Sequence, residues 1–306
     1  MMILITMAIM IFFFSYITGP ERSKVPFTLM LYDDNSKSMV DNSSLIQNNI
    51  GQAFARKTVS ADFNSDGTKD FVSASHPEHP DKEFSFLDII ISNGNGWEQI
   101  TLSKQSRVTY WEYENSGYYH GVDVGDIDND GDIDIVVAMW HNPEKGVSLW
   151  RNDGQGNFSE ENKIIKLKSG ANLDKENSSF VVDLLDFNSD GCLDLVYSWG
   201  PTLIKTGNCD GTFGPEFLEF EVGGHGGALA YDLDNDNDND LIFRKETNGE
   251  VSISIYENNG DNTFTFSNNF PAQGIGEPID LKDMNNDGKL DIIGRDAHPW
   301  GDENYF

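Results

Sequence analysis

Oxygen-bearing side chains recur in this chain at alternate positions of a nine-residue pattern, Asp-x-Asp/Asn-x-Asp-Gly/Asn-x-x-Asp. The five copies occupy residues 62–70, 126–134, 186–194, 232–240 and 283–291. Side-chain oxygens at positions 1, 3 and 5, the backbone carbonyl of position 7 and the carboxylate of position 9 can surround a hard cation, and Ca2+ takes about six to eight oxygen ligands. The pattern therefore predicts up to five bound Ca2+ ions.

The predicted metal ligands are the residues at positions 1, 3, 5, 7 and 9 of every copy. They are Asp62, Asn64, Asp66, Thr68 and Asp70; Asp126, Asp128, Asp130, Asp132 and Asp134; Asp186, Asn188, Asp190, Cys192 and Asp194; Asp232, Asp234, Asp236, Asp238 and Asp240; and Asp283, Asn285, Asp287, Lys289 and Asp291. Position 6 needs a positive φ, which Gly adopts without strain. The fourth copy carries Asn237 there, and Asn tolerates this conformation best after Gly. The exception therefore agrees with the pattern.

An EF-hand loop begins in the same way, but it ends with a bidentate Glu at position 12 and lies between helices. Position 12 of the five copies is Ser73, Val137, Tyr197, Phe243 and Gly294. Each copy is followed by a short run of β-branched and aromatic residues, which is typical of a strand. The loops are therefore predicted to connect strands, with the Asp at position 9 replacing the Glu. Acidic turns without a metal are the alternative, because Asp, Asn and Gly are ordinary turn formers; the fivefold repetition favours the metal.

The spacing of the copies predicts the architecture. Their first residues are 46 to 64 positions apart, which is in the range of propeller and array repeats. Each of the first four copies is followed by two further strand patterns that flank a hairpin sequence rich in Asn and Gly, such as Asn-Asp-Gly at 152–154. Four antiparallel strands per repeat make one blade of a β-propeller.

These repeats resemble the FG-GAP and VCBS repeats of integrin-α-type β-propellers, in which the calcium loop joins the first two strands of a blade. The resemblance covers roughly residues 57–294, and it implies an all-β propeller and a metal rather than one particular activity. We expect five blades, with strands at residues 27–33 and 39–46 completing the last blade from the other terminus, because closure removes exposed strand edges. A truncated seven-bladed propeller is the alternative.

The N-terminal residues 1–24 contain the only long apolar run, residues 3–18. This run is shorter than the about 20 residues of a membrane span, and it predicts a signal peptide or an N-terminal anchor. Residues 25–306 are then predicted to form a single propeller domain of a protein that is secreted, periplasmic or on the cell surface. Export agrees with calcium modules of the extracellular type, which bind at about 0.1–1 mM.

The formal net charge of −30 limits the partners. Such a charge repels nucleic acids and anionic membranes, so a membrane is expected only through the N-terminal segment. A glycan or an extracellular protein is the predicted partner.

The two cysteines are Cys192, at position 7 of the third loop, and Cys209, in the next hairpin. If Gly200 and Pro201 form the tight turn between the second and third strands, residues 192 and 209 lie directly opposite each other. This register predicts a disulfide, which would add about 3 kcal/mol of stability. Two free thiols are the alternative.

Histidines and tryptophans are predicted on the face opposite the calcium loops, where the loops after each second strand and the links between blades lie. The candidate ligand-binding residues are His120, His141, His225, His298, Trp111, Trp140, Trp199 and Trp300. Aromatic rings and imidazoles suit stacking and hydrogen bonding to sugars. For each single residue, packing between blades or a solvated loop is the alternative.

The leading hypothesis is a non-catalytic recognition module for a glycan or a surface partner. A polysaccharide lyase or hydrolase is the alternative. It would use His120 or His225 as base, with Arg244 or Lys245 as the cation. No G-x-S-x-G, H-E-x-x-H or paired-carboxylate signature stands outside the acidic loops. A structural adhesin subunit of a surface complex is the third hypothesis.

Overall fold

A computed structural model describes most of the chain between residues 30 and 296. The described residues are 30–33, 38–41, 54–76, 84–94, 96–106, 118–140, 146–165, 181–198, 202–220, 228–247, 250–261, 263–272, 275–282, 284 and 291–296. All regular secondary structure in these residues is β-strand, numbered β1 to β20. This confirms the predicted all-β class.

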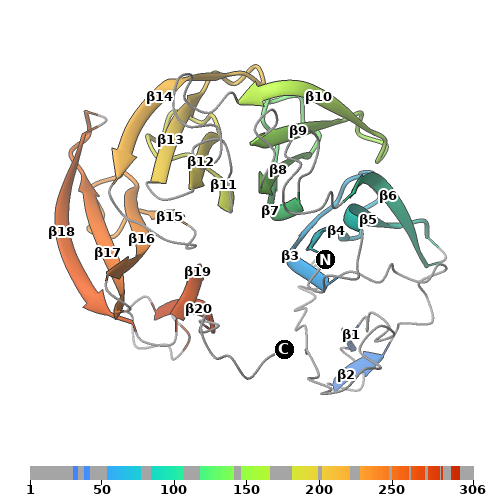
Figure 1. Cartoon of the computed structure of the whole chain (residues 1–306), viewed down its shortest axis with the longest axis horizontal. Helices are drawn as coiled ribbons and strands as arrows, with labels where there is room; N and C mark the ends of the chain where they lie inside the picture. Colours follow the sequence, from blue (N-terminus) through green and yellow to red (C-terminus); the bar gives the residue numbers. More distant parts are fainter. Residues whose placement is uncertain are drawn as a thin grey trace, which may run out of the picture.

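Four sheets have four antiparallel strands each and follow one another along the chain. Their first strands are β3 (Phe54–Ala61), β7 (Tyr118–Gly125), β11 (Val181–Leu185) and β15 (Ala228–Tyr231), and their second strands are β4 (Asp70–His76), β8 (Asp134–Trp140), β12 (Asp194–Ser198) and β16 (Asp240–Thr247). Their third strands are β5 (Phe84–Ser92), β9 (Val147–Asn152), β13 (Thr202–Gly207) and β17 (Glu250–Asn258), and their fourth strands are β6 (Trp97–Ser106), β10 (Phe158–Ile165), β14 (Phe213–Phe220) and β18 (Phe264–Pro271). Within each sheet the spatial order is the chain order, and the sheets follow one another around an arc (Figure 1). The four-stranded, blade-like units are as predicted.

The second strand of each sheet starts at the last Asp of an acidic loop and continues with apolar residues. In β8, Ile135, Val136 and Val137 have exposed fractions of only 0 to 1%. A strand that is covered on both faces carries a continuous apolar run, and β-branched residues favour the extended backbone. The run after each loop therefore explains both the strand and its place inside the sheet.

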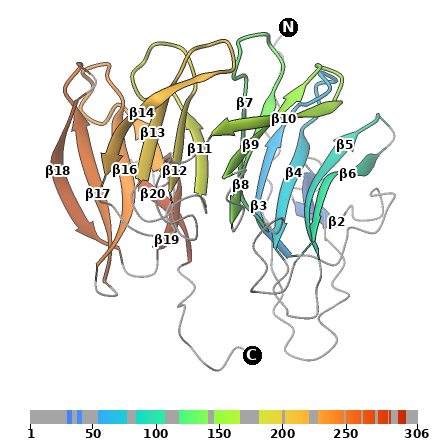
Figure 2. The same cartoon turned by 45° about the horizontal axis from the view of Figure 1, so that its top comes forward.

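The hydrophobic core lies between neighbouring sheets. Successive clusters of buried residues join the first sheet to the second, the second to the third, the third to the fourth, and the fourth to the last strand pair; Figure 2 shows the sheets standing side by side. Position 2 of the acidic loops contributes to this core. Phe63 packs edge-on against Phe158 of the next sheet with ring centroids 5.4 Å apart, and Phe187 lies 5.9 Å from Phe264. Each of these polar loops is thus anchored in an adjoining blade.

Two further sheets have two strands each. β1 (Met30–Asp33) pairs with β2 (Ser38–Asp41), and β19 (Ile275–Lys282) pairs with β20 (Asp291–Asp296). Strands are therefore present in or overlapping the segments predicted to complete a fifth blade. Among the described residues, however, no ladder joins the two pairs, and they occupy separate places in Figure 1. Closure of a fifth blade is not seen, and the number of blades stays a prediction.

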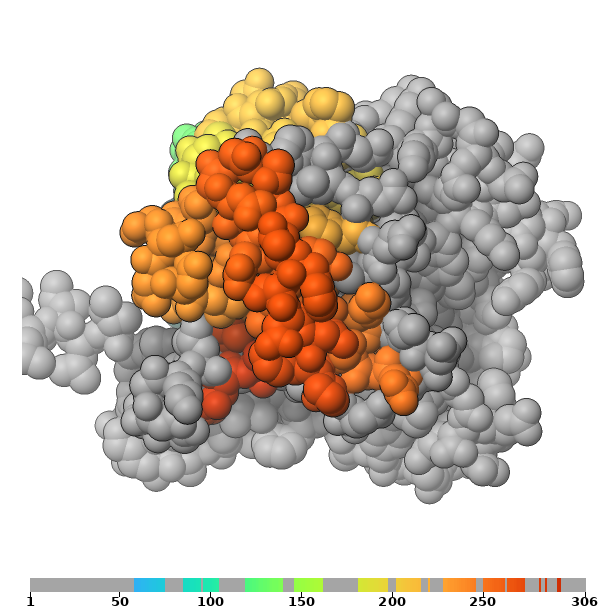
Figure 3. Space-filling model, turned by 90° about the vertical axis from the view of Figure 1, so that its left-hand side faces the viewer, coloured from blue at the N-terminus to red at the C-terminus, as the bar shows by residue number. Residues whose placement is uncertain are grey.

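The outermost strand of the fourth sheet, β18, is exposed along its length. Figure 3 shows it as an orange band across one side of the molecule. Phe266 and Phe270 are 53% and 44% exposed, and the strand has no charged residue. Charged residues protect many sheet edges from pairing with other chains, so β18 is a comparatively unprotected edge.

In the part of the chain that the structure describes, no helix has the length and apolarity needed to cross a membrane. Residues 1–24, with the apolar run at 3–18, lie outside that part.

Candidate metal centres

The first four acidic loops fold in the same way around the Asp at position 1. In the second loop, the two carboxylate oxygens of Asp126 accept the backbone N–H groups of Asp130 at 3.1 Å and of Gly131 at 3.0 Å. Asp130 accepts the N–H of Asp132 at 2.9 Å. The corresponding bonds are present in the first, third and fourth loops. The backbone therefore curls around the first aspartate in each loop.

Two positions of each of these four loops have a left-handed backbone. Position 6 has φ values of 84° to 95° at the three glycines and of 75° at Asn237, as predicted. A Cβ added at Gly67, Gly131 or Gly191 would meet no atom within 4 Å, so the backbone angle and not a lack of space selects Gly. Position 4 is also left-handed, which the sequence analysis missed, although its small polar residues are a signal for it. These residues are Ser65, Asn129, Ser189 and Asn235, with φ from 56° to 64°.

Two of the loops bring three carboxylates together, with one oxygen of each within 4.8 Å of the others. The clusters are Asp126, Asp128 and Asp130 in the second loop and Asp232, Asp234 and Asp236 in the fourth. In the cluster of the second loop, Asp128 Oδ1 is buried and has no hydrogen-bond partner among the described residues. A buried acceptor without a donor, next to two further carboxylates, has the chemistry of a ligand for a hard cation. The residues present therefore fit Ca2+.

The first and third loops have Asn at position 3, and its amide group donates to the carboxylate at position 5. Asn64 lies 3.4 Å from Asp66, and Asn188 lies 2.9 Å from Asp190. The Ser92 hydroxyl also donates to Asp66 and is the main reason why the pKa of that carboxyl lies below its ordinary value. These two loops therefore supply their own donors and carry one negative charge fewer at position 3.

The Asp at position 9 is buried inside the sheet, with exposed fractions of 0 to 2%. These residues are Asp70, Asp134, Asp194 and Asp240. One carboxylate oxygen accepts a backbone N–H from the end of the third strand, at 2.6 to 3.0 Å. In the first, third and fourth loops the other oxygen accepts the N–H of position 2, at 2.8 to 3.1 Å. This Asp thus ties the loop to the third strand, a role that the sequence analysis missed; its part as a metal ligand stays a prediction.

Burial changes the protonation of these carboxyl groups. Desolvation raises the pKa of Asp70 and of Asp134 to about 6 and that of Asp194 to about 7, although backbone N–H donors act in the opposite direction. The pKa of Asp240 is raised for the same reason. Loop aspartates add to the rise at Asp70 and Asp194, whereas the positive charge of Arg151 opposes it at Asp134. A cation in the loop would favour the ionised forms.

Position 7 lies against the hairpin of the same sheet. A Cβ added to Gly154 would lie 2.4 Å from the Asp132 carboxylate, and one added to Gly260 would lie 2.8 Å from that of Asp238. In the third loop this contact is covalent, because Cys192 at position 7 forms the expected disulfide with the hairpin residue Cys209.

The register that suggested this disulfide is wrong by one residue. The β12–β13 ladder pairs Leu195 with Lys205, so that residue 192 would face residue 208 and not 209. Both cysteines lie beyond the end of this ladder, where the pleat no longer dictates the pairing, and Cys209 adopts a φ of 57°. The turn assumed at Gly200 and Pro201 lies outside the described residues.

The fifth loop is described only in part. The N–H of Met284 donates to Asp291 at 2.9 Å, which is the bond between positions 2 and 9 seen in three other loops. The remaining predicted ligands, Asp283, Asn285, Asp287 and Lys289, lie outside the described residues.

Three asparagines of the described residues connect neighbouring sheets through the loops, and none of them was predicted to do so. Asn239 donates to the carbonyl of Asp186 in the preceding sheet at 2.7 Å. The Asn152 amide donates to the carbonyl of Phe63 in the preceding sheet at 2.8 Å. The Asn258 amide donates to the carbonyl of Phe187 in the same way at 3.2 Å. Asn152 and Asn258 are the last residues of their third strands, and each begins a hairpin sequence that was interpreted only as a turn.

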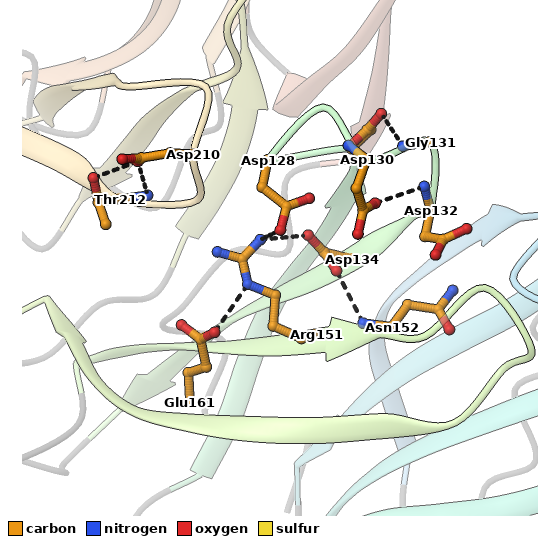
Figure 4. A network of polar contacts seen from close by, with 11 residues as sticks. Asp128, Asp130, Gly131, Asp132, Asp134, Arg151, Asn152, Glu161, Asp210 and Thr212 are labelled. Carbon is orange, nitrogen blue, oxygen red and sulfur yellow. Dashed lines mark hydrogen bonds and ion pairs between the residues drawn. The ribbon is translucent and has the colours of Figure 1, made fainter.

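An arginine of β9 also lies against the second loop (Figure 4). Arg151 Nη1 is 3.0 Å from Asp128 Oδ2 and 2.8 Å from Asp134 Oδ2, and its Nε donates to Glu161 at 3.1 Å. The sequence analysis gave Arg151 no role, because nothing in the nine-residue pattern points to a residue seventeen positions beyond it.

Little of the predicted ligand-binding face falls on described residues. His120 lies on β7 and is partly buried, and Trp140 ends β8 with a side chain that is not described. The residues outside the described part are Trp111, His141, Trp199, His225, His298 and Trp300. Arg244, a candidate cation of the enzyme hypothesis, is only 8% exposed on β16. The sugar-binding face therefore stays a prediction.

Comparisons with known proteins agree with the repeats described above. A model of the FG-GAP-like repeat matches residues 62–137, 126–197 and 232–294. The T-cell immunomodulatory protein homolog of Plasmodium falciparum (isolate 3D7) is 27% identical over 186 residues, which cover 58% of this chain and 23% of that protein. The crystal structure of the V. cholerae biofilm matrix protein Bap1 is 14% identical with a TM-score of 0.39, covering 84% of this chain and 34% of that one.

This chain thus spans well under half the length of either relative. The segments that match the repeat model each begin at the first Asp of an acidic loop and together span more than half of the chain. The chain belongs to the family of FG-GAP-like repeat proteins.

Proposed function

We propose that this chain is an exported, calcium-stabilised β-propeller that acts as a non-catalytic recognition module for a glycan or an extracellular protein. The observation that carries the proposal is the convergence of three carboxylates in the second and fourth loops, with Asp128 Oδ1 buried and unpartnered among the described residues. Like charges this close oppose folding unless a cation compensates them. The loops therefore have a structural reason to bind a metal.

The contacts of the loops support a scaffold role for the ion. Position 1 organises the turn, position 2 packs between sheets, and position 9 binds the third strand. When bound, Ca2+ would compensate the negative charge of the converging carboxylates. In the second loop Asp126, Asp128 and Asp130 would hold it, together with the carbonyl of Asp132. Ordering the loop would then order both sheets that it contacts.

The expected calcium affinity, the net charge and the Plasmodium relative support export and recognition of an extracellular partner. Extracellular calcium modules bind at about 0.1–1 mM, a concentration range that belongs outside the cytosol. A net charge of −30 favours neutral or basic partners over nucleic acids. The Plasmodium relative carries the name of an immunomodulatory protein homolog, which supports a partner outside the cell.

Calcium titration of chelator-treated protein tests the metal part of the proposal. Calorimetry is expected to register uptake with Kd of about 0.1–1 mM, and Ca2+ at a hundred times Kd is expected to add about 2.7 kcal/mol per site. Mg2+ is the control ion, because it keeps its waters and demands octahedral geometry, so it should stabilise the fold less. No uptake, together with an unchanged melting temperature in EDTA, would contradict the proposal.

A glycan array, read with Ca2+ and with EDTA, tests the recognition part. Binding in Ca2+ that disappears in EDTA is the expected result. The double variant Asp126→Asn with Asp130→Asn is the matched control. It removes two carboxylate ligands from the second loop and keeps the shapes of the side chains. An array that stays empty in Ca2+, with the fold intact by circular dichroism, would remove the glycan as the ligand.

A further inference from the structure

Arg151 places a positive charge against the ligand residues of the second loop (Figure 4). Its side chain is only 15% exposed and lies between position 3, Asp128, and position 9, Asp134, at 3.0 and 2.8 Å. Glu161 on β10 holds the other edge of the guanidinium at 3.1 Å. The arginine uses Oδ2 of Asp128, while Oδ1 of the same carboxylate is buried without a partner in the described part of the chain.

The other sheets have different residues at this place. The place is defined by the next residue along the chain, whose N–H donates to the Asp at position 9 in all four sheets. The equivalents of Arg151 are Ile91, Thr206 and Glu257. Among these four sheets, a cation at this place is therefore a property of the second.

The fourth loop is the matched contrast. Both loops have Asp at positions 1, 3, 5, 7 and 9, and both bring the first three carboxylates together. Where the second sheet has Arg151, the fourth has Glu257, which accepts a hydrogen bond from Ser267 at 2.6 Å. The two loops thus differ by two units of formal charge at one neighbouring position.

The guanidinium also reaches the third sheet. A Cβ added at Gly211 would overlap Arg151 Nη2, so the arginine packs directly on the hairpin after β13. At the junctions on either side, Asn152 and Asn258 bridge the sheets. At this junction the equivalent residue is Gly207, which has no side chain to do so. Arg151 therefore lies where the asparagine bridge is missing.

We propose that Arg151 is the resident cation of the second loop: it lowers that loop's affinity for Ca2+ relative to the fourth loop and joins the second and third sheets when no ion is bound. The inference rests on the calcium binding proposed above. A unit positive charge a few ångströms from the ligand oxygens repels a divalent ion, and even with the dielectric constant of water this corresponds to about a tenfold loss of affinity. Because Asp128 Oδ1 stays available, the loop binds the ion weakly instead of not at all.

Calorimetric Ca2+ titration in a background without the fourth site tests the affinity. In the double variant Asp232→Asn with Asp236→Asn, the further change Arg151→Met is expected to tighten one site by about tenfold. Met is chosen because it keeps an unbranched apolar stem. Arg151→Lys keeps the charge and is expected to keep the weak affinity, which separates charge from shape.

The mirror experiment transfers the cation to the fourth loop. In the background Asp126→Asn with Asp130→Asn, the change Glu257→Arg is expected to weaken one site by about tenfold or more. The remaining loops are common to all variants, so a change in one site is attributable to the loop under test.

Melting temperatures supply a second readout that does not depend on affinity. In EDTA, Arg151→Met is expected to lower the melting temperature by about 5 °C or more, and in saturating Ca2+ by less. Ca2+ binding with unchanged or weaker affinity in Arg151→Met overturns this inference alone, and an unchanged melting temperature in EDTA overturns its inter-sheet part. If neither loop binds Ca2+, the proposed function and this inference fail together.

Discussion

The second and fourth acidic loops have aspartates at the same five positions and form the same turn, yet the charged residues next to them differ. In the second loop Arg151 compensates two carboxylates and packs on the next sheet. At the equivalent position the fourth sheet has Glu257, which carries the opposite formal charge and accepts a hydrogen bond from Ser267. Copies of one motif are therefore not equivalent sites. The motif determines the turn, and residues outside it determine which of its carboxylates have a cationic partner.

The third loop is held in place in another way. It has Asn188 at position 3, and the disulfide between Cys192 and Cys209 ties position 7 to the hairpin. The second and third loops are thus fastened without an ion, by a salt bridge and by a covalent bond. We expect the fourth loop to be the one whose order depends most on Ca2+.

The largest expected difference concerns the buried Asp at position 9. Asp134→Ala removes the acceptor of a backbone N–H and leaves Arg151 without its buried partner, and we expect a cost of about 3–5 kcal/mol. Asp240→Ala leaves two backbone N–H groups unsatisfied, and we expect about 2–3 kcal/mol. Urea unfolding in EDTA at pH 8 measures both. Equal costs would show that the ion pair adds nothing to the second loop.

Removal of the disulfide should cost slightly less. The double variant Cys192→Ser with Cys209→Ser is expected to lose about 3 kcal/mol, because the bridge closes a loop with a sequence separation of 17. Urea unfolding of the variant, compared with the unchanged chain in the absence of reductant, is the measurement. A loss below about 1 kcal/mol would mean that the third loop is held by its hydrogen bonds alone.

The next smaller expected effect is the difference in calcium-dependent stability between the second and the fourth loop. At Ca2+ a hundred times the Kd of the fourth loop, Asp232→Asn with Asp236→Asn is expected to lose about 2.7 kcal/mol of the stabilisation by the ion. If the second loop binds tenfold more weakly, Asp126→Asn with Asp130→Asn loses only about 1.4 kcal/mol. The melting temperature in Ca2+ minus that in EDTA measures the calcium-dependent stabilisation of each variant. The reverse order would contradict the role given to Arg151.

The smallest expected effect is the pH dependence of the ion-free protein. The pKa values of about 6 for Asp70 and Asp134 and about 7 for Asp194 lie above the ordinary value of 3.8. A raised folded-state pKa contributes stability that is fully present below the unfolded value and is lost as the pH rises through the folded value. In EDTA the melting temperature should therefore fall by a few degrees between about pH 4 and pH 7.

Calcium should reverse this trend, since the ion binds ionised carboxylates. Melting curves at pH 5, 6 and 7, with EDTA and with Ca2+, make the comparison, and Asp194→Asn is the control that removes the group with the highest pKa. An ion-free protein that becomes less stable as the pH falls from 7 to 5 would contradict the expectation.

Much of the local structure could be predicted from the residues alone. The glycines at position 6 required a positive φ, the β-branched runs after each loop required strands, and the Asn-Gly sequences required hairpins. These features depend on neighbours in the chain, which is why a pattern of nine residues reveals them. The disulfide pairing was also found, although through a register that was wrong by one residue.

The connections between sheets could not be predicted in the same way. Asn152 reaches Phe63 across 89 residues of sequence, and Arg151 packs against Gly211 in the hairpin of the third sheet. Such contacts are set by the packing of one sheet on the next, and no local rule marks an Asn or an Arg at the end of a strand as a bridge. The predicted union of the two termini in a fifth blade was likewise a non-local inference, and the two strand pairs remain separate sheets among the described residues.

The sequence by itself determined the acidic turns, the strand order and the places where carboxylates converge, because these follow from the backbone preferences of adjacent residues. Only the tertiary structure decided which convergent charges are compensated. The structure places Arg151 against the second loop, whereas the equivalent residue of the fourth sheet, Glu257, accepts a hydrogen bond from Ser267. The electrostatic energy of a carboxylate depends on whichever charge lies within a few ångströms of it, however far away in the chain that charge begins.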